Sequence, residues 1–283
     1  MSIAADSNFL LTMAASSRLR DDRARAQLSD AQQRSQLLCK DAPAPLILQT
    51  VGFDVIAEIK KRSPAEGQLD GSLATTAQQV DSYVEGGAAA LSVLTEPEQF
   101  LGNLDDLHEI AEQVRAVPVM RKDFLISRYQ VREARLAGAS GVLLIAAMLS
   151  SDQLKAMLDA AFELNMFVLL EAFDRPDLDK AVPILERFGR PLDANGRCNY
   201  LLGLNCRDLR TLQVDFAHFE RLAPALPVDM PWVAESGVNN ITQAATLAKL
   251  GYRLVLVGTA LMRSPDPAAT VREFRAAGVA ACS

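Results

Sequence analysis

The stretch GVLLIAAMLSSDQLKAMLDAAFELNMFVLLEA, residues 141–172, contains the structural unit from which most of the chain is built. It begins with the hydrophobic run GVLLIA (141–146) and continues with SSDQLKAMLDAAFELN, whose apolar residues have helical spacing. It ends with a second hydrophobic run, FVLLEA (167–172). Runs that are apolar at nearly every position are typical of parallel strands covered on both faces. The stretch therefore predicts a strand, a helix and a second strand parallel to the first.

The same alternation extends along the chain in both directions. The other predicted strands are DVIAEI (54–59), AALSVL (89–94), PVMRKD (118–123), YLLGLN (200–205), PWVAES (231–236) and RLVLVG (253–258). Several helices end in glycine, as in EGGAAALSV, LAGASGVLL and KLGYRLVLV, because glycine accepts the left-handed conformation that ends a helix. Eight strand–helix units predict an α/β fold, a (β/α)8 TIM barrel over residues 51–283. A doubly wound open sheet is the alternative that strand counting leaves open.

Two segments stand outside this alternation. Residues 1–50, which include SSRLRDDRARAQLSDAQQRSQLL, predict an N-terminal helical extension rather than a separate domain. The run NFLLTMAA near its start is short and follows Asp6 instead of a basic segment, so we interpret it as an amphipathic helix and not as an export signal. The irregular stretch ERFGRPLDANGRCN (186–199) predicts an inserted loop between the fifth and sixth units.

Composition limits the function classes. Of the 283 residues, 49% are hydrophobic, which is enough for a large core. The net charge of −6 argues against a nucleic-acid or membrane-surface binder, and no segment approaches the roughly 20 apolar residues that span a bilayer. We therefore expect a soluble protein of the reducing cytoplasm. A structural zinc site is not expected, because only two histidines accompany four cysteines that lack CxxC spacing: Cys39, Cys198, Cys206 and Cys282.

Polar side chains gather at the ends of the predicted strands. In a (β/α)8 barrel the carboxyl ends of the strands form the active-site face. Because side chains alternate along a strand, Glu58 and Lys60 are expected on one face, pointing into the barrel mouth. A single strand-end charge is often solvated or ion-paired, but a convergence of many would be costly for structure alone. The residues that predict a catalytic site are Glu58, Lys60, Arg62, Ser63, Arg121, Lys122, Asp123, Glu171, Asn205, Arg207, Glu235 and Ser236.

Two glycines follow the last two predicted strands. Gly237 comes directly after the seventh strand, and Gly258 ends the eighth. In many barrels the loops at these places bind phosphate through backbone N–H groups, and glycine permits the close approach. The hydroxyls of Ser236 and Thr259 can add donors. The pattern favours a phosphorylated small-molecule substrate.

Seven segments resemble indole-3-glycerol-phosphate synthase, a family of tryptophan biosynthesis. They are VIAEIKKRSP, LSVLTEPEQFLGN, PVMRKDF, GASGVLLIAAML, LLGLNCRDLRTLQVD, VAESGV and LVGTALMRSPDP. The resemblance covers all eight predicted units in order, and it fits the helical extension. It implies a (β/α)8 barrel with no metal or organic cofactor. It also implies conversion of 1-(2-carboxyphenylamino)-1-deoxyribulose 5-phosphate to indole-3-glycerol phosphate, with release of carbon dioxide and water.

The resemblance further implies roles for single residues. Lys122 would polarise or protonate the substrate ketone, and Lys60 and Glu171 would carry out the loss of water. The carboxylates that orient the lysines and the substrate would be Glu58 and Glu235. Residues against the anthranilate part would be Asn205, Arg207, Phe124, Leu143 and Leu209. Residues around the phosphate would be Arg62, Ser63, Ser236, Gly237, Gly258 and Thr259.

Three positions depart from the common family pattern. Ala65 stands where Ser or Thr is frequent, Phe173 where His is common, and Cys206 where Asn or a small polar residue is common. None of these changes removes a proposed acid or base. An isomerase-like phosphosugar barrel is a second hypothesis, but it would need a Cys/Asp pair that Glu58 and Lys60 do not supply. A third is a non-catalytic partner-binding barrel, which would be expected to have lost one of these acids or bases. The oligomeric state is left open.

Overall fold

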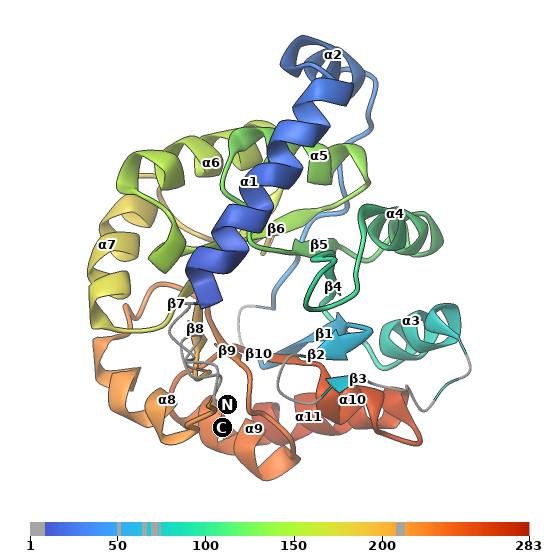
Figure 1. Cartoon of the computed structure of the whole chain (residues 1–283). Helices are drawn as coiled ribbons and strands as arrows, with labels where there is room; N and C mark the ends of the chain where they lie inside the picture. The colour runs from blue at the N-terminus through green and yellow to red at the C-terminus, as the bar shows by residue number, and fades with distance from the viewer. Residues whose placement is uncertain are drawn as a thin grey trace, which may run out of the picture.

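A closed barrel of eight parallel strands forms the centre of the molecule (Figure 1). The computed structural model describes residues 9–49, 52–63, 67–68, 73, 75–207 and 213–282. Around the barrel the strands follow the order β1-β10-β9-β8-β7-β6-β5-β4. They are β1 (Asp54–Ile59), β4 (Ala90–Leu94), β5 (Val119–Lys122), β6 (Gly141–Ile145), β7 (Phe167–Ala172), β8 (Tyr200–Asn205), β9 (Trp232–Glu235) and β10 (Leu254–Val257). This closure confirms the predicted TIM barrel and excludes the open sheet.

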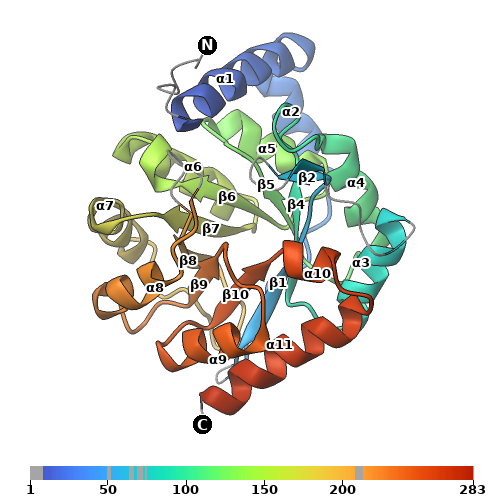
Figure 2. The ribbon, with the colours of Figure 1, turned by 60° about the horizontal axis from the view of Figure 1, so that its bottom comes forward.

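Helices follow the strands and surround the barrel (Figure 2). They are α3 (Thr76–Glu85), α4 (Leu104–Gln113), α5 (Arg128–Leu136), α6 (Ser151–Glu163), α7 (Arg175–Glu186), α8 (Ala217–Leu222), α9 (Ile241–Lys249), α10 (Thr259–Met262) and α11 (Pro267–Ala281), with 3₁₀ turns η1 (Ala146–Met148) and η2 (Ala223–Ala225). In the described part of the chain, no helix combines the length and the apolar character needed to cross a membrane.

Local sequence explains where the helices begin and end. Ser150 caps α6 in a capping box with Gln153, which satisfies two backbone N–H groups at the start of the helix. The predicted glycine stops are confirmed, because Gly87, Gly138 and Gly251 follow their helices with φ of +81°, +99° and +95°. Each of these turns leads the chain into the next barrel strand.

Alternate residues of each strand enter two different apolar clusters. In β1, Val55 and Ala57 pack outward against the helices, whereas Ile56 packs inside the barrel. All six β1 residues are buried, which explains why the strand reads as a nearly continuous hydrophobic run. Glu58 follows Ile56 on the inner face, so the alternation that builds the core also directs a carboxylate into the barrel mouth.

The N-terminal segment forms α1 (Phe9–Gln27) and α2 (Asp30–Leu37), as predicted. The α1 helix packs against α5 and η1, and α2 packs against α5. The Tyr129 hydroxyl of α5 donates to the carbonyls of Ala24 and Leu28, at 2.9 and 2.8 Å. Polar contacts thus fasten the extension to the barrel.

The predicted inserted loop lies at the amino-terminal end of the barrel strands. The Leu48 N–H donates to the Gly196 carbonyl at 2.9 Å, and the Cys198 N–H donates to the Leu46 carbonyl at 2.8 Å. Leu46, Leu48 and Leu192 join the apolar cluster inside the barrel. The insertion therefore helps to close the bottom of the barrel, and it lies away from the strand ends that carry the predicted site.

Candidate active site

A cavity opens at the carboxyl ends of the barrel strands, and most of the predicted site residues line it. Those that line it are Glu58, Lys60, Lys122, Phe124, Leu143, Glu171, Asn205, Arg207, Glu235, Ser236, Gly237, Gly258 and Thr259. Arg62 is not among the lining residues, because it lies in the small antiparallel pair of β2 (Arg62–Ser63) and β3 (Gly67–Gln68), opposite Gln68. The Ser63 side chain and Leu209 lie outside the described residues.

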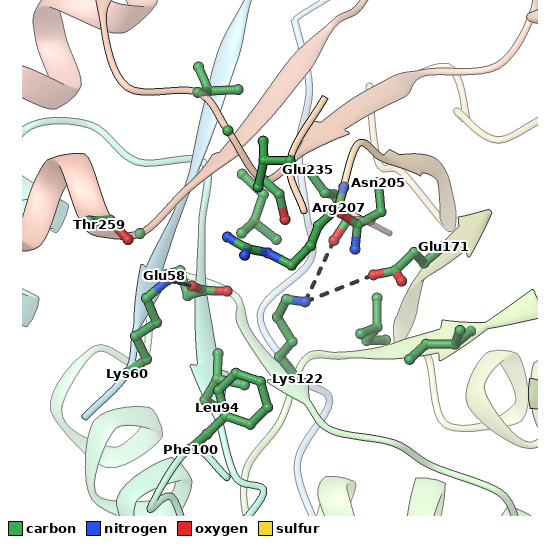
Figure 3. Close-up of a pocket in the computed structure, with 18 of the residues that line it drawn as sticks. Glu58, Lys60, Leu94, Phe100, Lys122, Glu171, Asn205, Arg207, Glu235 and Thr259 are labelled. Carbon is green, nitrogen blue, oxygen red and sulfur yellow. Dashed lines mark hydrogen bonds and ion pairs between the residues drawn. The ribbon is translucent and has the colours of Figure 1, made fainter. Parts of the chain in front are cut away.

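Lys122 stands at the end of β5, between carboxylates (Figure 3). Its Nζ is 3.7 Å from a carboxylate oxygen of Glu235 and 3.9 Å from one of Glu171. Burial by itself would lower the pKa of Lys122, but the charges of Glu235, Glu171 and Glu58 outweigh it and raise that pKa. Lys122 is therefore held as an ammonium ion whose side chain is only 16% exposed.

A second lysine forms a tight ion pair on the other side of the cavity. Lys60 Nζ is 2.9 Å from Glu58 Oε1. Burial raises the pKa of Glu58, but Lys60 and Lys122 together lower it below its ordinary value. A Cβ at position 258 would lie 2.5 Å from Glu58 Oε1 and 3.0 Å from Lys60 Nζ. Gly258 therefore makes room for this ion pair.

Glu235 is the most unusual carboxylate of the cluster. It is 1% exposed, and in the part of the chain that the structure describes neither carboxylate oxygen has a hydrogen-bond partner. Burial and the neighbouring charge of Glu171 raise its pKa well above the ordinary value, although Lys122 opposes them. The protonated form of Glu235 is thereby favoured.

Asp123, next to Lys122 in the chain, ties the extension to the site. Its carboxylate accepts two hydrogen bonds from Arg20 of α1, both 2.8 Å, and one from Arg121 at 3.0 Å. The Thr95 hydroxyl donates a further bond at 2.8 Å. Burial raises the pKa of Asp123, but Arg121 and Arg20 hold it far below its usual range. The Asp123 carboxylate is fully buried and fully paired.

Aromatic side chains from three segments form one wall of the cavity. Phe9 of α1 meets Phe124 edge to face at 5.8 Å between ring centroids, and Phe100 lies 6.3 Å from Phe124. The turn that carries Phe100 is held by the buried Glu96, which accepts hydrogen bonds from the N–H groups of residues 98–100. This wall gives an apolar, planar surface next to the charged cluster.

The loops after β8 and β9 pack against each other through the Cys206 side chain. Its Sγ is 3.3 Å from the Ser236 carbonyl oxygen and would lie 3.0 Å from a Cβ at position 237. Ser236 and Gly237 both have φ of +67°, a conformation that is strained for serine. Burial raises the pKa of Cys206 to about 12, so the thiol stays neutral. Cys206 supports the turn and does not line the cavity.

The other family departure that the structure describes also lies outside the cavity. The Phe173 ring stacks on His218 at 4.9 Å between centroids, with an interplanar angle of 20°. The ring nitrogen Nε2 of His218 lies 2.5 Å from the Phe173 carbonyl oxygen. Phe173 thus fastens the start of α7 to α8, and the change from His removes no side chain from the site. Ala65 lies outside the described residues.

The sequence analysis missed several residues that line the cavity. They are Phe9, Leu94, Phe100, Ile145, Val214, Val238, Asn239 and Leu256. Leu94 ends the predicted strand 89–94, and Ile145 is the next-to-last residue of the predicted strand 141–146, so the strand-end rule could have identified them if it had been applied to apolar residues. Phe9 and Phe100 carry no such signal, because α1 and the 95–103 loop reach the cavity only through tertiary packing.

Fold and site together define a (β/α)8-barrel enzyme whose cavity at the strand ends is lined by lysines and glutamates. Residues 12–274 match the model of the family described as indole-3-glycerol phosphate synthase. The chain is 42% identical over 226 residues to the indole-3-glycerol phosphate synthase of a Nocardioides species, covering 80% of this chain and 81% of the relative. It is 41% identical over 241 residues to that of Mycobacterium leprae, covering 84% and 83%. The chain belongs to the indole-3-glycerol phosphate synthase family.

A similar fold occurs in a more distant solved structure. The 3-hexulose-6-phosphate synthase of Salmonella typhimurium superposes with a TM-score of 0.61 at 15% sequence identity, covering 81% of this chain and 99% of that one. At this identity the likeness concerns the barrel fold alone.

Proposed function

We propose that this chain is an indole-3-glycerol phosphate synthase, a carboxy-lyase of tryptophan biosynthesis. It would convert 1-(2-carboxyphenylamino)-1-deoxyribulose 5-phosphate to indole-3-glycerol phosphate, carbon dioxide and water. The observation that carries the proposal is the position of the Lys122 ammonium between Glu171 and Glu235, in a cavity with an aromatic wall.

In the first step the aromatic carbon that bears the carboxylate attacks the ketone carbon. The carbon–carbon bond forms as the ketone π electrons move to oxygen, and Lys122 supplies the positive charge and proton that this oxygen needs. A charge that is already positioned costs no reorganisation when the alkoxide develops. Loss of carbon dioxide then returns an electron pair to the ring and restores its aromaticity.

The second step removes the new hydroxyl group as water. Lys60 and Glu171 lie on opposite sides of Lys122 (Figure 3), so one proton can be given and another taken at separate points on the intermediate. We assign the donation to Lys60, which Glu58 holds as its ion-pair partner, and the acceptance to Glu171. Glu235, 3.7 Å from the Lys122 ammonium, orients it.

Binding of the two ends of the substrate follows from the lining of the cavity. Phe124 and Leu143 provide an apolar surface for the anthranilate ring, and Arg207 provides a cation for its carboxylate. The Asn205 amide oxygen accepts from the Arg207 N–H at 2.9 Å, which fixes the backbone there. We place the phosphate at the loops after β9 and β10, against Ser236, Gly237, Gly258 and Thr259. The cavity lining gives no support for Arg62 in this role.

The cellular setting and the division of the chain are also proposals. All four cysteines are unpaired, which supports a reducing cytoplasm. We treat residues 1–50 as an extension of the barrel at 51–283, because α1 and α2 rest on the barrel and Phe9 completes its cavity.

The proposal is tested by supplying the purified chain with two substrates in turn. With 1-(2-carboxyphenylamino)-1-deoxyribulose 5-phosphate we expect the fluorescence of the indole product to rise, with one carbon dioxide released for each product formed. With phosphoribosyl-anthranilate we expect no conversion. Turnover of the second compound, or consumption of the first without carbon dioxide release, would favour the isomerase-like alternative.

A further inference from the structure

A groove lined by arginines lies outside the candidate active site. It opens between the end of α1, α2, α5 and the first turns of α6, and four of its lining residues are Arg25, Arg34, Arg128 and Arg132. None of the four lines the cavity at the barrel mouth. The groove thus has walls from both the N-terminal extension and the barrel.

The arginines are only partly balanced by acids. Arg25 pairs with Asp21 at 2.8 Å and with Asp30 at 2.7 Å, and Arg132 also contacts Asp30. The remaining two arginines, Arg34 and Arg128, are exposed, and their side chains form no hydrogen bond or ion pair with any residue that the structure describes. Four cations therefore face two carboxylates, so the groove is positive on a chain whose net charge is −6.

The two paired arginines are held in place, which prepares the groove for a ligand. Arg25 lies over the ring of Tyr129, with 4.6 Å between the guanidinium carbon and the ring centroid. Arg132 donates to the Gln33 amide oxygen at 2.8 Å, and its side chain is 11% exposed. Burial lowers the pKa of Arg132, and the neighbouring charges of Arg34, Arg128 and Arg25 lower it further against the effect of Asp30. The Arg132 side chain is thus held within a local excess of positive charge.

We propose that this groove binds a small anion of the phosphate and polyphosphate class, which bridges the extension and the barrel. Guanidinium groups present paired N–H donors that match two phosphate oxygens, and such charge-assisted bonds are among the strong ones. Arg34 of α2 and Arg128 of α5 are the two groups with unused donors, and they come from the two sides of the groove. A bound anion would neutralise their repulsion and link α2 to α5.

The consequence is a firmer attachment of the extension. Arg25 belongs to the same helix as Arg20, which binds Asp123, and as Phe9, which lines the active-site cavity. An anion in the groove therefore holds the far end of the helix whose beginning completes the active site. This inference concerns binding alone and does not depend on the proposed reaction.

The test uses inorganic pyrophosphate as the probe and amide hydrogen exchange as the readout. The wild-type chain is compared with Arg34→Gln/Arg128→Gln and with the charge-matched control Arg187→Gln/Arg190→Gln, whose exposed arginines lie between α7 and β8. In wild type and control, we expect pyrophosphate to slow exchange in residues 25–37 and 126–132. In Arg34→Gln/Arg128→Gln, the concentration that gives half of this protection should rise about tenfold or more.

The location of the protection separates this groove from the active site. Slower exchange confined to the loops after β9 and β10, in all three proteins, would mean that pyrophosphate binds only at the active site, and the proposal would be overturned. Equal protection of residues 25–37 and 126–132 in all three proteins would also overturn it, because binding would then not depend on Arg34 and Arg128. Circular dichroism without the anion checks that both double variants are folded.

Discussion

Gly203 shows how a missing side chain shapes the acid cluster. It lies in β8 level with Glu171 of β7 and Val233 of β9. A Cβ at this position would lie 2.1 Å from Glu235 Oε1 and 3.0 Å from a methyl carbon of Leu169. The space that Gly203 leaves empty is therefore the space that the Glu235 carboxylate fills.

Gly203→Ala should displace the Glu235 carboxylate, which is one of the two partners of Lys122. We expect kcat to fall about 100-fold, because a shift of about 1 Å in a catalytic group has effects of this size. The free energy of unfolding should fall by about 1–3 kcal/mol from overpacking. In a Glu235→Ala background the added methyl group has room, so Gly203→Ala should lower the free energy of unfolding much less. Equal losses in both backgrounds, measured by denaturant unfolding, would contradict this explanation.

The raised pKa of Glu235 predicts a stability that depends on pH. A carboxyl whose pKa is higher in the folded state than in the unfolded state binds its proton more tightly when folded. Stability from this group is present below the unfolded pKa and is lost as pH rises towards the folded pKa, which lies well above 4.5. Glu235→Gln carries no such group, so its free energy of unfolding should exceed that of wild type at pH 8.

This prediction is checked by urea unfolding of wild type and Glu235→Gln at pH 5 and pH 8. We expect the advantage of the variant to be larger at pH 8 than at pH 5. The exposed Glu273→Gln serves as the matched control and should follow wild type at both pH values. An advantage that is the same at both pH values would show that Glu235 is ionised in the folded protein.

At the scale of elements, α1 is connected to the site through one buried ion pair. Arg20 donates two hydrogen bonds to Asp123, whose neighbour in the chain is Lys122. Arg20→Met removes them, although Arg121 still partly balances Asp123. We expect the free energy of unfolding to fall by about 1–3 kcal/mol. KM should rise as well, because Phe9 would no longer be held against Phe124.

Arg23→Met is the control for this prediction, since Arg23 is an exposed residue of the same helix. Amide hydrogen exchange should become faster along α1 in Arg20→Met and remain unchanged in Arg23→Met. If both variants keep the exchange rates and KM of wild type, the ion pair does not control the docking of α1.

Strands could be predicted from sequence more completely than the walls of the cavity. The bounds of β1, β7 and β8 agree with the predicted 54–59, 167–172 and 200–205. For β1 the hydrophobic run is bounded by Asp54 and Lys60, and for β8 by Asn199 and Asn205. The β2–β3 pair was not predicted, because two-residue strands carry no periodic signal.

The same difference holds within the site. Glu58, Lys60, Lys122, Glu171, Asn205 and Glu235 were predicted to converge because each ends a strand, and the structure places all six around one cavity. Phe9 and Phe100 were missed because their positions depend on the docking of α1 and on the turn held by Glu96. The need for glycine at positions 203 and 258 could not be predicted either, because the side chains that fill the space come from other strands.

On the scale of the whole molecule, the barrel brings charges from strands far apart in sequence into one cavity. The ion pair of β1, the lysine of β5 and the carboxylates of β7 and β9 meet there because the sheet is closed. The extension covers the same end and adds an aromatic side chain. The central claim is that this assembly makes Lys122 the acid of ring closure.

The most direct test of that claim compares Lys122→Ala with Lys249→Ala. Lys249 is an exposed residue in the last turn of α9, so its variant controls for the loss of one lysine. Both variants are checked for folding by circular dichroism, and indole-3-glycerol phosphate formation is then followed by fluorescence. We predict that kcat falls by about 10³-fold in Lys122→Ala and stays at the wild-type value in Lys249→Ala. A folded Lys122→Ala that keeps the wild-type kcat would contradict the account.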